Sequence, residues 1–226
     1  MKDLVIMGLD DLAEVAKFFF EHDSDYKVAA FTVDRRYKKT EEFCGLPVYD
    51  FEDIEQRFPP EKYEMFIAIG YSHMNKTREE KYLAAKQKGY RLASYVSTHA
   101  TCWIGKDQIG DNCFILEDNT IQPFVKIGNN VTLWSGNHIG HHVQIGNHVF
   151  IASHVVLSGR TCVEDHCFIG VNATIHDHVV IRKNSVIGAG ALITRDTEPG
   201  AVYKNQYTQK DMKHSDELKY FGGKSG

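Results

Sequence analysis

An aliphatic residue recurs at every sixth position from residue 109 to residue 193 without one interruption. The column consists of Ile109, Ile115, Ile121, Ile127, Leu133, Ile139, Ile145, Ile151, Leu157, Val163, Ile169, Ile175, Ile181, Ile187 and Ile193. An α-helix cannot use this period, because six residues at 3.6 per turn swing each side chain about 120° away from the one before. A chain that turns a corner every six residues can point all of them inward.

This six-residue period predicts a parallel β-helix, in which short strands form the flat faces of a prism and turns form its corners. Three hexads complete one triangular coil, so residues 109–198 make about five coils. With stacked strands about 4.8 Å apart, the prism is expected to be about 20–25 Å tall. An ordinary β-sandwich is the alternative, but it does not explain a strict period without an insertion.

Two further positions in the hexad support the prism. The residue four places after each column member is mostly small or β-branched, and Asn119 and Asn137 are the plainly polar exceptions. Glycine directly follows the column residue at positions 110, 128, 140, 146, 170 and 188. We expect these glycines to supply the backbone freedom that a corner needs.

The first 96 residues alternate between strand and helix patterns. Strands are predicted over residues 2–7, 27–33, 65–69 and 91–96, with an edge segment near residues 45–49. Helices are predicted over residues 12–20 and 75–89, and a short one over 50–58 is expected to be capped by Asp50. This alternation indicates a small Rossmann-like sheet in residues 1–96, followed by the β-helix in 97–200 and a tail in 201–226.

Composition restricts the classes of partner. The net charge of −4 has both signs dispersed along the 226 residues, which argues against binding to nucleic acid or to a membrane surface. The opening segment carries Asp10, Asp11 and Glu14, so no signal-like segment is predicted and we expect a cytoplasmic protein. Five cysteines without a CxxC pair are expected to be reduced core residues.

Histidine is the residue type that a β-helix core does not explain. Eight of the twelve histidines fall within the prism on positions expected to face outward. His148 and His166 are eighteen residues apart and should stack on one edge, with Asn130 below and Asn184 above. A solvated polar corner and a metal site are both open interpretations of this stack.

The chain resembles the hexapeptide-repeat sugar acyltransferases. Three features carry this resemblance: the six-residue repeat, the domain before it, and residues 137–142, which read Asn-His-Ile-Gly-His-His. It is most similar to the N-acetyltransferases that modify nucleotide-linked 4-amino-4,6-dideoxysugars, such as those of the bacillosamine and perosamine pathways. The resemblance covers nearly the whole chain. It implies a left-handed prism, a homotrimer and acetyl-CoA lying between neighbouring prisms, with no metal expected.

The resemblance also implies site residues in the prism. His141 matches the general base, and a neutral imidazole suits removal of a proton from an attacking amine. His138 is the second candidate base and is otherwise expected to bind the substrate. The acidic residue that commonly follows the base is replaced by His142, so another carboxylate assists His141 or it works unassisted. Gly159 matches the backbone N–H that holds the thioester oxygen, and Val171 and Ala189 match positions that contact the coenzyme A arm.

In the N-terminal domain the resemblance implies a site for the nucleotide end of the sugar. Gly8 begins the turn expected to cradle the diphosphate, although Asp10 and Asp11 replace the usual glycines there. Asp34 matches an acid near the base or ribose, and Gly70 a glycine after the third strand. Asn75 and Arg78 follow on the next helix and are expected to reach the phosphates, with Arg78 as the compensating cation.

These observations predict transfer of acetyl from acetyl-CoA to the amino group of a dTDP-, UDP- or GDP-linked 4-amino-4,6-dideoxysugar. A β-helix zinc enzyme of the carbonic anhydrase type is a second possibility, but such enzymes lack the preceding domain. A non-catalytic scaffold is a third, because the glycine turn and the residue after His141 are altered.

Overall fold

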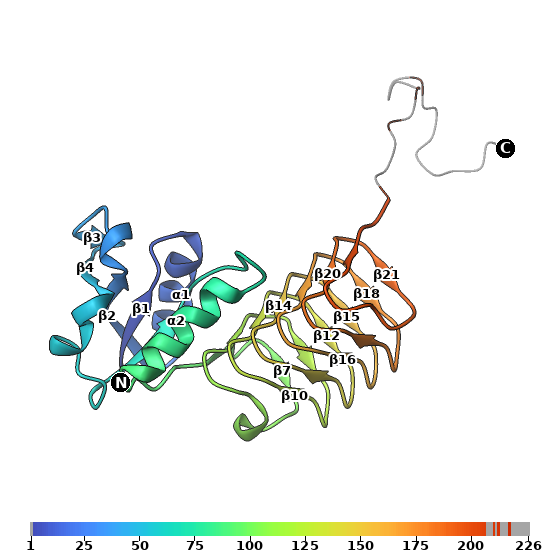
Figure 1. Cartoon of the computed structure of the whole chain (residues 1–226). Coiled ribbons are helices and arrows are strands. Elements are labelled where there is room, and N and C mark those ends of the chain that lie inside the picture. Colours follow the sequence, from blue (N-terminus) through green and yellow to red (C-terminus); the bar gives the residue numbers. More distant parts are fainter. Residues whose placement is uncertain (1, 207–209, 211, 213–216, 218–226) are drawn as a thin grey trace.

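The computed structural model describes residues 2–206, 210, 212 and 217, so most of the tail expected over residues 201–226 lies outside the described residues. The described chain forms a sheet with flanking helices followed by a prism of stacked coils (Figure 1). Within this part of the chain, neither α-helix combines the length and apolar character needed to cross a bilayer.

The N-terminal sheet has the strand order β3-β4-β2-β1-β5 and is parallel except between β3 and β4. Its strands are β1 (Lys2–Met7), β2 (Tyr26–Val33), β3 (Glu42–Phe43), β4 (Leu46–Asp50) and β5 (Tyr63–Ile67). Its α-helices are α1 (Asp11–His22) and α2 (Lys76–Gln87), and its 3₁₀ helices are η1 (Arg35–Tyr37) and η2 (Phe51–Gln56).

Each face of this sheet is covered by one α-helix, because successive side chains of a strand point to opposite faces. Leu4 and Ile6 of β1 pack with α1, whereas Val5 and Met7 pack in a second cluster with Tyr82 of α2. The strand and helix alternation expected from the sequence is therefore present.

Two local predictions in this region are wrong. The segment 91–96 is not one strand of the N-terminal sheet, since Leu92 makes only an isolated bridge to Met65 while β6 (Tyr95–Val96) pairs with the prism. Asp50 does not cap η2 with its side chain, because its carboxylate instead accepts a 2.7 Å hydrogen bond from Nε of Arg35.

The prism is built from three parallel sheets, each made of two-residue strands. One face, the β10 face, holds β10 (Lys126–Ile127), β13 (Gln144–Ile145), β16 (Cys162–Val163) and β19 (Val180–Ile181). A second, the β11 face, holds β6, β8 (Phe114–Ile115), β11 (Thr132–Leu133), β14 (Phe150–Ile151), β17 (Phe168–Ile169), β20 (Val186–Ile187) and β22 (Val202–Tyr203). The third, the β12 face, holds β7 (Thr101–Cys102), β9 (Thr120–Ile121), β12 (His138–Ile139), β15 (Val156–Leu157), β18 (Thr174–Ile175) and β21 (Leu192–Ile193). A short 3₁₀ helix, η3 (Lys106–Gln108), precedes the regular coils.

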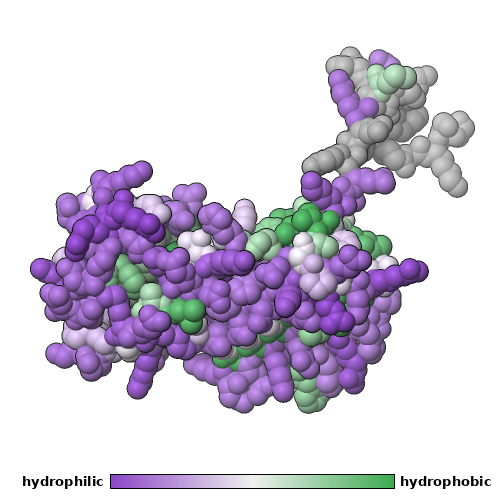
Figure 2. Space-filling model, viewed as in Figure 1, coloured by the Kyte–Doolittle hydropathy of each residue, from purple (hydrophilic) through white to green (hydrophobic). Residues whose placement is uncertain are grey.

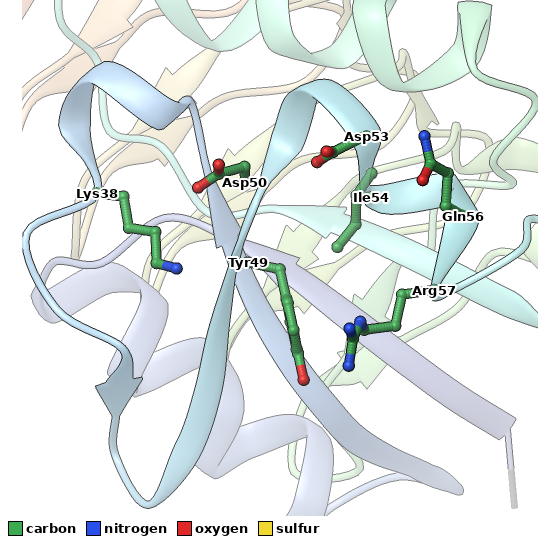
Figure 3. A pocket seen from close by; sticks show the side chains of 7 residues that line it. All are labelled: Lys38, Tyr49, Asp50, Asp53, Ile54, Gln56 and Arg57. Atoms are coloured by element: carbon green, nitrogen blue, oxygen red, sulfur yellow. The ribbon is translucent and has the colours of Figure 1, made fainter.

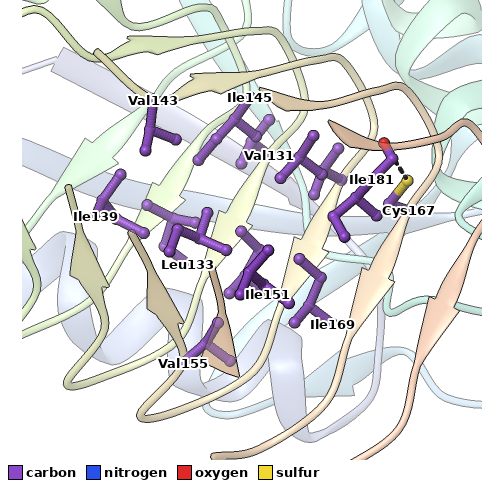
Figure 4. Packing of buried hydrophobic residues seen from close by; sticks show 14 of the residues in the cluster. Val131, Leu133, Ile139, Val143, Ile145, Ile151, Val155, Cys167, Ile169 and Ile181 are labelled. Atoms are coloured by element: carbon purple, nitrogen blue, oxygen red, sulfur yellow. Dashed lines mark hydrogen bonds between the residues drawn. The ribbon is translucent and has the colours of Figure 1, made fainter. Parts of the chain in front are cut away.

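The aliphatic column fills the interior of the prism, as the period predicts. Ile139 pairs in register with Leu157, eighteen residues on, and the same offset relates Leu133 to Ile151. Figure 4 shows these side chains gathered inside the coils, with Cys167 among them. Burial raises the pKa of the Cys167 thiol to about 12, so this cysteine is an inert core residue. Stacked parallel sheets of this kind fit a left-handed β-helix with hexapeptide repeats.

The corners of the prism use a different residue from the one expected. The left-handed backbone conformation falls on the third residue after each column member, which is most often Asn or His, as at Asn130, His148 and His166. Asparagine and histidine are among the side chains enriched in this conformation. The glycines directly after the column have ordinary φ values, and an added Cβ on Gly128 would lie 2.6 Å from the carbonyl oxygen of Gly146. They are required by the close approach of the next coil, not by backbone freedom.

The three edges of the prism carry different side chains. The α2 edge comprises residues 110–113, 128–131, 146–149, 164–167 and 182–185. The His141 edge comprises residues 122–125, 140–143, 158–161 and 176–179. The Ala189 edge comprises residues 116–119, 134–137, 152–155, 170–173 and 188–191. The β12 face lies between the His141 edge and the Ala189 edge, because its strands join these corners in the chain.

Candidate active site

His141 and Gly159 lie in contact on adjacent coils of the His141 edge. The imidazole lies so close to Gly159 that an added Cβ would be 2.7 Å from Nε2 and 2.6 Å from Cε1. The Gly159 N–H has no acceptor among the described residues, and the residue is partly exposed. The His141 backbone is fixed from the coil below, since its N–H donates a 2.8 Å hydrogen bond to Oε1 of Gln122. A proton acceptor and a free backbone donor thus share one accessible corner.

His142 is the immediate neighbour of this pair. Its Nδ1 lies 3.2 Å from Nδ1 of His141, and the two rings are nearly perpendicular. The ring of Phe124 on the coil below covers His142, with centroids 4.7 Å apart. Burial lowers the pKa of His142, and the positive charge of Arg160 and the neighbouring His141 lower it further. His142 is therefore a neutral imidazole at neutral pH.

His138 lies on the outer side of the β12 face, three residues before His141. It is half-buried and stands between Thr120 and Val156 on the neighbouring strands. The structure thus places His141 on a corner and His138 on the adjoining flat face, as the hexad positions predict. No contact between the two imidazoles occurs among the described residues.

Val171 and Ala189 stack eighteen residues apart on the Ala189 edge. Both are exposed, and the Val171 carbonyl accepts a 2.8 Å hydrogen bond from Gly190. The structure brings these two residues together but separates them from His141 and Gly159 by the width of the β12 face. One coenzyme A molecule can contact both pairs only by crossing that face or by lying between two copies of the chain.

The start of helix α1 is closed by its own acidic residues. Gly8 has a φ of +135°, and a Cβ there would lie 2.5 Å from the Ala68 carbonyl oxygen, so glycine is required. The Asp10 side chain caps α1 by accepting from the Ala13 N–H, and Asp11 and Glu14 lie in the first turn. These carboxylates oppose the binding of a phosphate at the helix N-terminus.

Asp34 and Gly70 follow the carboxyl ends of β2 and β5, two parallel strands that lie on either side of β1. Asp34 is buried, and its carboxylate pairs with Nζ of Lys81 on α2 at 2.8 Å and with Arg36 at 3.7 Å. Gly70 follows β5 and has open space around its Cα. A ligand that uses the Asp34 carboxylate must share it with or displace Lys81.

The structure does not support the expected phosphate role of Asn75 and Arg78. Both are buried between α2 and the prism. Arg78 donates from Nη2 to the carbonyl oxygens of Asn130 and Val149 and from Nη1 to the Thr132 hydroxyl, while Asn75 donates to the Cys167 carbonyl. Burial lowers the pKa of Arg78 to about 10, which leaves it charged at neutral pH. These residues attach the N-terminal domain to the prism instead of facing solvent.

The stacked histidines lie beneath the same helix and are not a solvated corner. The rings of His148 and His166 stack with centroids 4.9 Å apart. Glu79 of α2 reaches both, with carboxylate oxygens 3.4 Å from His148 Nε2 and 3.6 Å from His166 Nε2. Within the part of the chain that the structure describes, this is the only such trio close enough to share a metal ion.

A chain of hydrogen bonds favours an interface role over a metal role for this trio. Asn112 is oriented by the Ile67 backbone, from which it accepts at 2.8 Å and to which it donates at 3.3 Å. Asn112 donates to Asn130 Oδ1, and Asn130 in turn donates to His148 Nδ1. Because Nδ1 of His148 accepts, the neutral ring carries its hydrogen on Nε2, where it faces Glu79. A metal would need a free lone pair at that nitrogen.

A well-defined pocket of the described chain lies elsewhere. It is lined by Lys38, Tyr49, Asp50, Asp53, Ile54, Gln56 and Arg57, beside β4 and η2 (Figure 3). No residue expected at the active site borders it. A thioester substrate would instead meet the open edges of the prism, which are convex and therefore not enclosed within one chain.

Several contacting residues were not expected from the sequence. Gln122 and Arg160 flank the His141 corner, and Glu79 reaches the stacked histidines. Gln122 and Arg160 are each nineteen residues from His141, so the eighteen-residue coil could have indicated them once His141 was chosen. Nothing in the sequence indicated Glu79.

Comparisons with known proteins agree with the repeat and the fold. Residues 108–139 and 125–159 match the family model of the bacterial transferase hexapeptide with six repeats. Residues 160–195 match the hexapeptide repeat of succinyl-transferase. A search of curated protein sequences finds no significant match.

Solved structures with the same fold extend the likeness over both domains. The acetyltransferase domain of PglB from Neisseria gonorrhoeae is 19% identical with a TM-score of 0.77, over 91% of this chain and 97% of that one. PerB from Caulobacter crescentus, in complex with CoA and GDP-perosamine, is 21% identical with a TM-score of 0.77, over 91% and 95%. WeeI from Acinetobacter baumannii is 21% identical with a TM-score of 0.75, over 89% and 96%. The likeness to hexapeptide-repeat proteins indicated by the sequence is thus confirmed.

Proposed function

We propose that this chain, which carries the bacterial transferase hexapeptide repeat in residues 108–195, transfers acetyl from acetyl-CoA to the amino group of a nucleotide-linked 4-amino-4,6-dideoxysugar. The observation that carries the proposal is the closeness of the His141 ring to Gly159 on one exposed corner, where the Gly159 N–H has no acceptor among the described residues. Support for the substrates comes from the fold shared with PerB, whose structure holds CoA and GDP-perosamine.

The proposed reaction needs no covalent enzyme intermediate. The sugar amine attacks the thioester carbonyl while Nε2 of His141 removes a proton from its nitrogen. The carbonyl oxygen gains negative charge, which the Gly159 N–H stabilises. The carbon–sulfur bond then breaks, and the coenzyme A thiolate recovers the proton from the imidazolium. His138, on the adjoining face, would contact the acceptor.

We further propose that the active enzyme is a homotrimer in which two chains form each site. Val171 and Ala189 would hold the coenzyme A arm on one chain, and His141 and Gly159 would act from its neighbour. The separation of these pairs across the β12 face supports this arrangement. Gly8, Asp34 and Gly70 would border the acceptor carrier, with the diphosphate displaced from the capped start of α1.

A substrate panel tests the proposal. The purified protein is incubated with acetyl-CoA and with dTDP-, UDP- and GDP-linked amino sugars or the corresponding free amino sugars, and acetylation is read by mass spectrometry. We expect one nucleotide-linked amino sugar to gain an acetyl group, and we expect His141→Asn to lower kcat by about 10²–10⁴-fold. Acetylation of none of them, or full activity in H141N, would contradict the proposal.

A further inference from the structure

We propose that His142 is a positioning residue that holds His141 in the tautomer required of a base, in the place where a carboxylate usually stands. The inference rests on the proposed function and adds a specific role to the residue beside the base. It is carried by the 3.2 Å contact between the two Nδ1 atoms.

Only one hydrogen can lie between these two ring nitrogens. If His141 donates, its Nδ1 carries the hydrogen and its Nε2 keeps a lone pair, which suits a base. If His142 donates, Nε2 of His141 carries the hydrogen and cannot accept a proton. The first arrangement is the catalytic one, because Nε2 is the ring nitrogen that lies against Gly159 beside the free N–H.

The surroundings of His142 suit the accepting role. The charged or titratable groups that face it are His141 on its own coil and Arg160 on the coil above, while Phe124 below is uncharged. Burial, Arg160 and His141 lower the pKa of His142, which favours the neutral ring. In the tautomer with its hydrogen on Nε2, the Nδ1 of this neutral ring accepts from His141. Its backbone is in the left-handed conformation with a φ of 60°, which fixes the direction of the side chain.

This arrangement has a consequence that a carboxylate would not have. A neutral imidazole orients His141 but adds no negative charge to stabilise the imidazolium formed during the reaction. The enzyme should therefore keep activity at lower pH than a variant with an acid at position 142. In His142→Asp the introduced carboxylate favours the charged imidazole, so the acid limb of the kcat/KM profile moves to higher pH.

Three substitutions compatible with the left-handed backbone test the role. His142→Gly removes the acceptor and should lower kcat roughly 10- to 100-fold with little change in KM for acetyl-CoA. His142→Asn restores an acceptor oxygen and should recover most of that loss. His178→Gly is the matched control, because His178 has the same backbone conformation on the same edge but pairs with Asp177, two coils above His142.

A measurement independent of activity completes the test. Nitrogen-15 NMR of the His141 ring should show hydrogen on Nδ1 in the wild type and in H142N, and a mixture of tautomers in H142G. Unchanged kcat, pH profile and tautomer in H142G would overturn the positioning role while leaving the acetyl transfer intact. An inactive wild type, or a fully active H141N, would instead overturn the proposed function.

Discussion

At His141, a single side chain depends on three coils of the prism. The backbone N–H of His141 donates to Gln122 on the coil below, and its ring contacts Gly159 on the coil above. On its own coil, the neighbouring His142 contacts Nδ1 of the His141 ring. None of these contacts needs a loop or a mobile lid. The position of the base is therefore as rigid as the stacked backbone that carries it.

Gly159→Ala tests this dependence at the scale of one methyl group. Gly159 does not have a positive φ, so alanine causes no backbone strain there. The added Cβ would lie 2.6 Å from Cε1 of His141 and must displace the ring. We expect kcat to fall on the order of 10²-fold, since a displacement of about 1 Å can cost that much, while the melting temperature changes little.

Ser158→Ala is the control for this prediction, because it alters the same corner without adding an atom. Steady-state kinetics and thermal unfolding of both variants provide the measurement. Full activity in G159A would mean that the imidazole does not act from its position over Gly159.

Among the elements, helix α2 has the most unusual attachment. The side chains buried on α2 include Arg78, Tyr82 and Ala85, spaced four and three residues apart on one face. A guanidinium thus stands where an apolar side chain would be expected. It is stabilised by backbone carbonyl groups of the α2 edge, which a cation can satisfy and an aliphatic side chain cannot.

Arg78→Ala should therefore destabilise the protein strongly. The substitution removes charged hydrogen bonds, each worth about 1.5–3 kcal/mol. It also leaves a cavity and removes the Arg78 donor from the Asn130 carbonyl oxygen, whereas the Val149 carbonyl keeps the Thr132 N–H. We expect the free energy of unfolding to fall by at least about 3 kcal/mol in a denaturant titration. Arg182→Ala removes a partly exposed arginine and should cost less than about 1 kcal/mol. Equal effects of the two substitutions would contradict the attachment role of Arg78.

The elements also show what the sequence could and could not predict. The column from Ile109 to Ile193 predicted the prism strands, because only a coil of three six-residue sides points every sixth residue inward. The strands of the N-terminal sheet were predicted nearly as well. The pairing of residues 95 and 96 with the prism was not predicted, because a strand pattern does not indicate which of two adjacent sheets the strand joins.

The site was predicted less completely than the fold. His141 and Gly159 were selected through the resemblance, and the structure brings them into contact. Asn75 and Arg78 were assigned to phosphates because they follow Gly70 on the next helix and Arg78 could compensate the diphosphate charge. Their burial depends on which side of α2 meets the prism, and this is decided by packing between segments more than fifty residues apart.

For the whole molecule, the main question is how many chains make one site. The visible surface is mostly hydrophilic, with hydrophobic side chains gathered at the end of the prism near β20 and β21 (Figure 2). On the His141 edge Phe124 is 69% exposed, directly below His142. In the proposed trimer this aromatic ring would lie beside the base at the edge that meets the second chain.

Mixed oligomers test whether two chains share a site. His141→Asn removes the base, and Ala189→Trp fills the proposed coenzyme A path on the other edge; each variant alone should be inactive. If each site combines one edge from each of two chains, equal co-expression should restore about a quarter of the wild-type activity by random assembly. Activity that stays at the level of the separate variants would show that both edges act within one chain.

Each eighteen-residue repeat adds one coil, so the number of repeats determines the height of the prism. The N-terminal domain contacts the prism as far along the chain as Cys167 and Phe168, and His141 lies within the same lower coils. An extra coil inserted above Ile193 would lengthen the end of the prism that lies away from the N-terminal domain. It would leave the attachment of that domain, the base and the pair Val171 and Ala189 in place. The same insertion between Asn130 and His148 would separate these two residues by one coil. It would break the hydrogen bond between them and move His148 and His166 away from Glu79 of α2. Added coils are therefore compatible with the attachment and the base at the end of the prism away from the N-terminal domain.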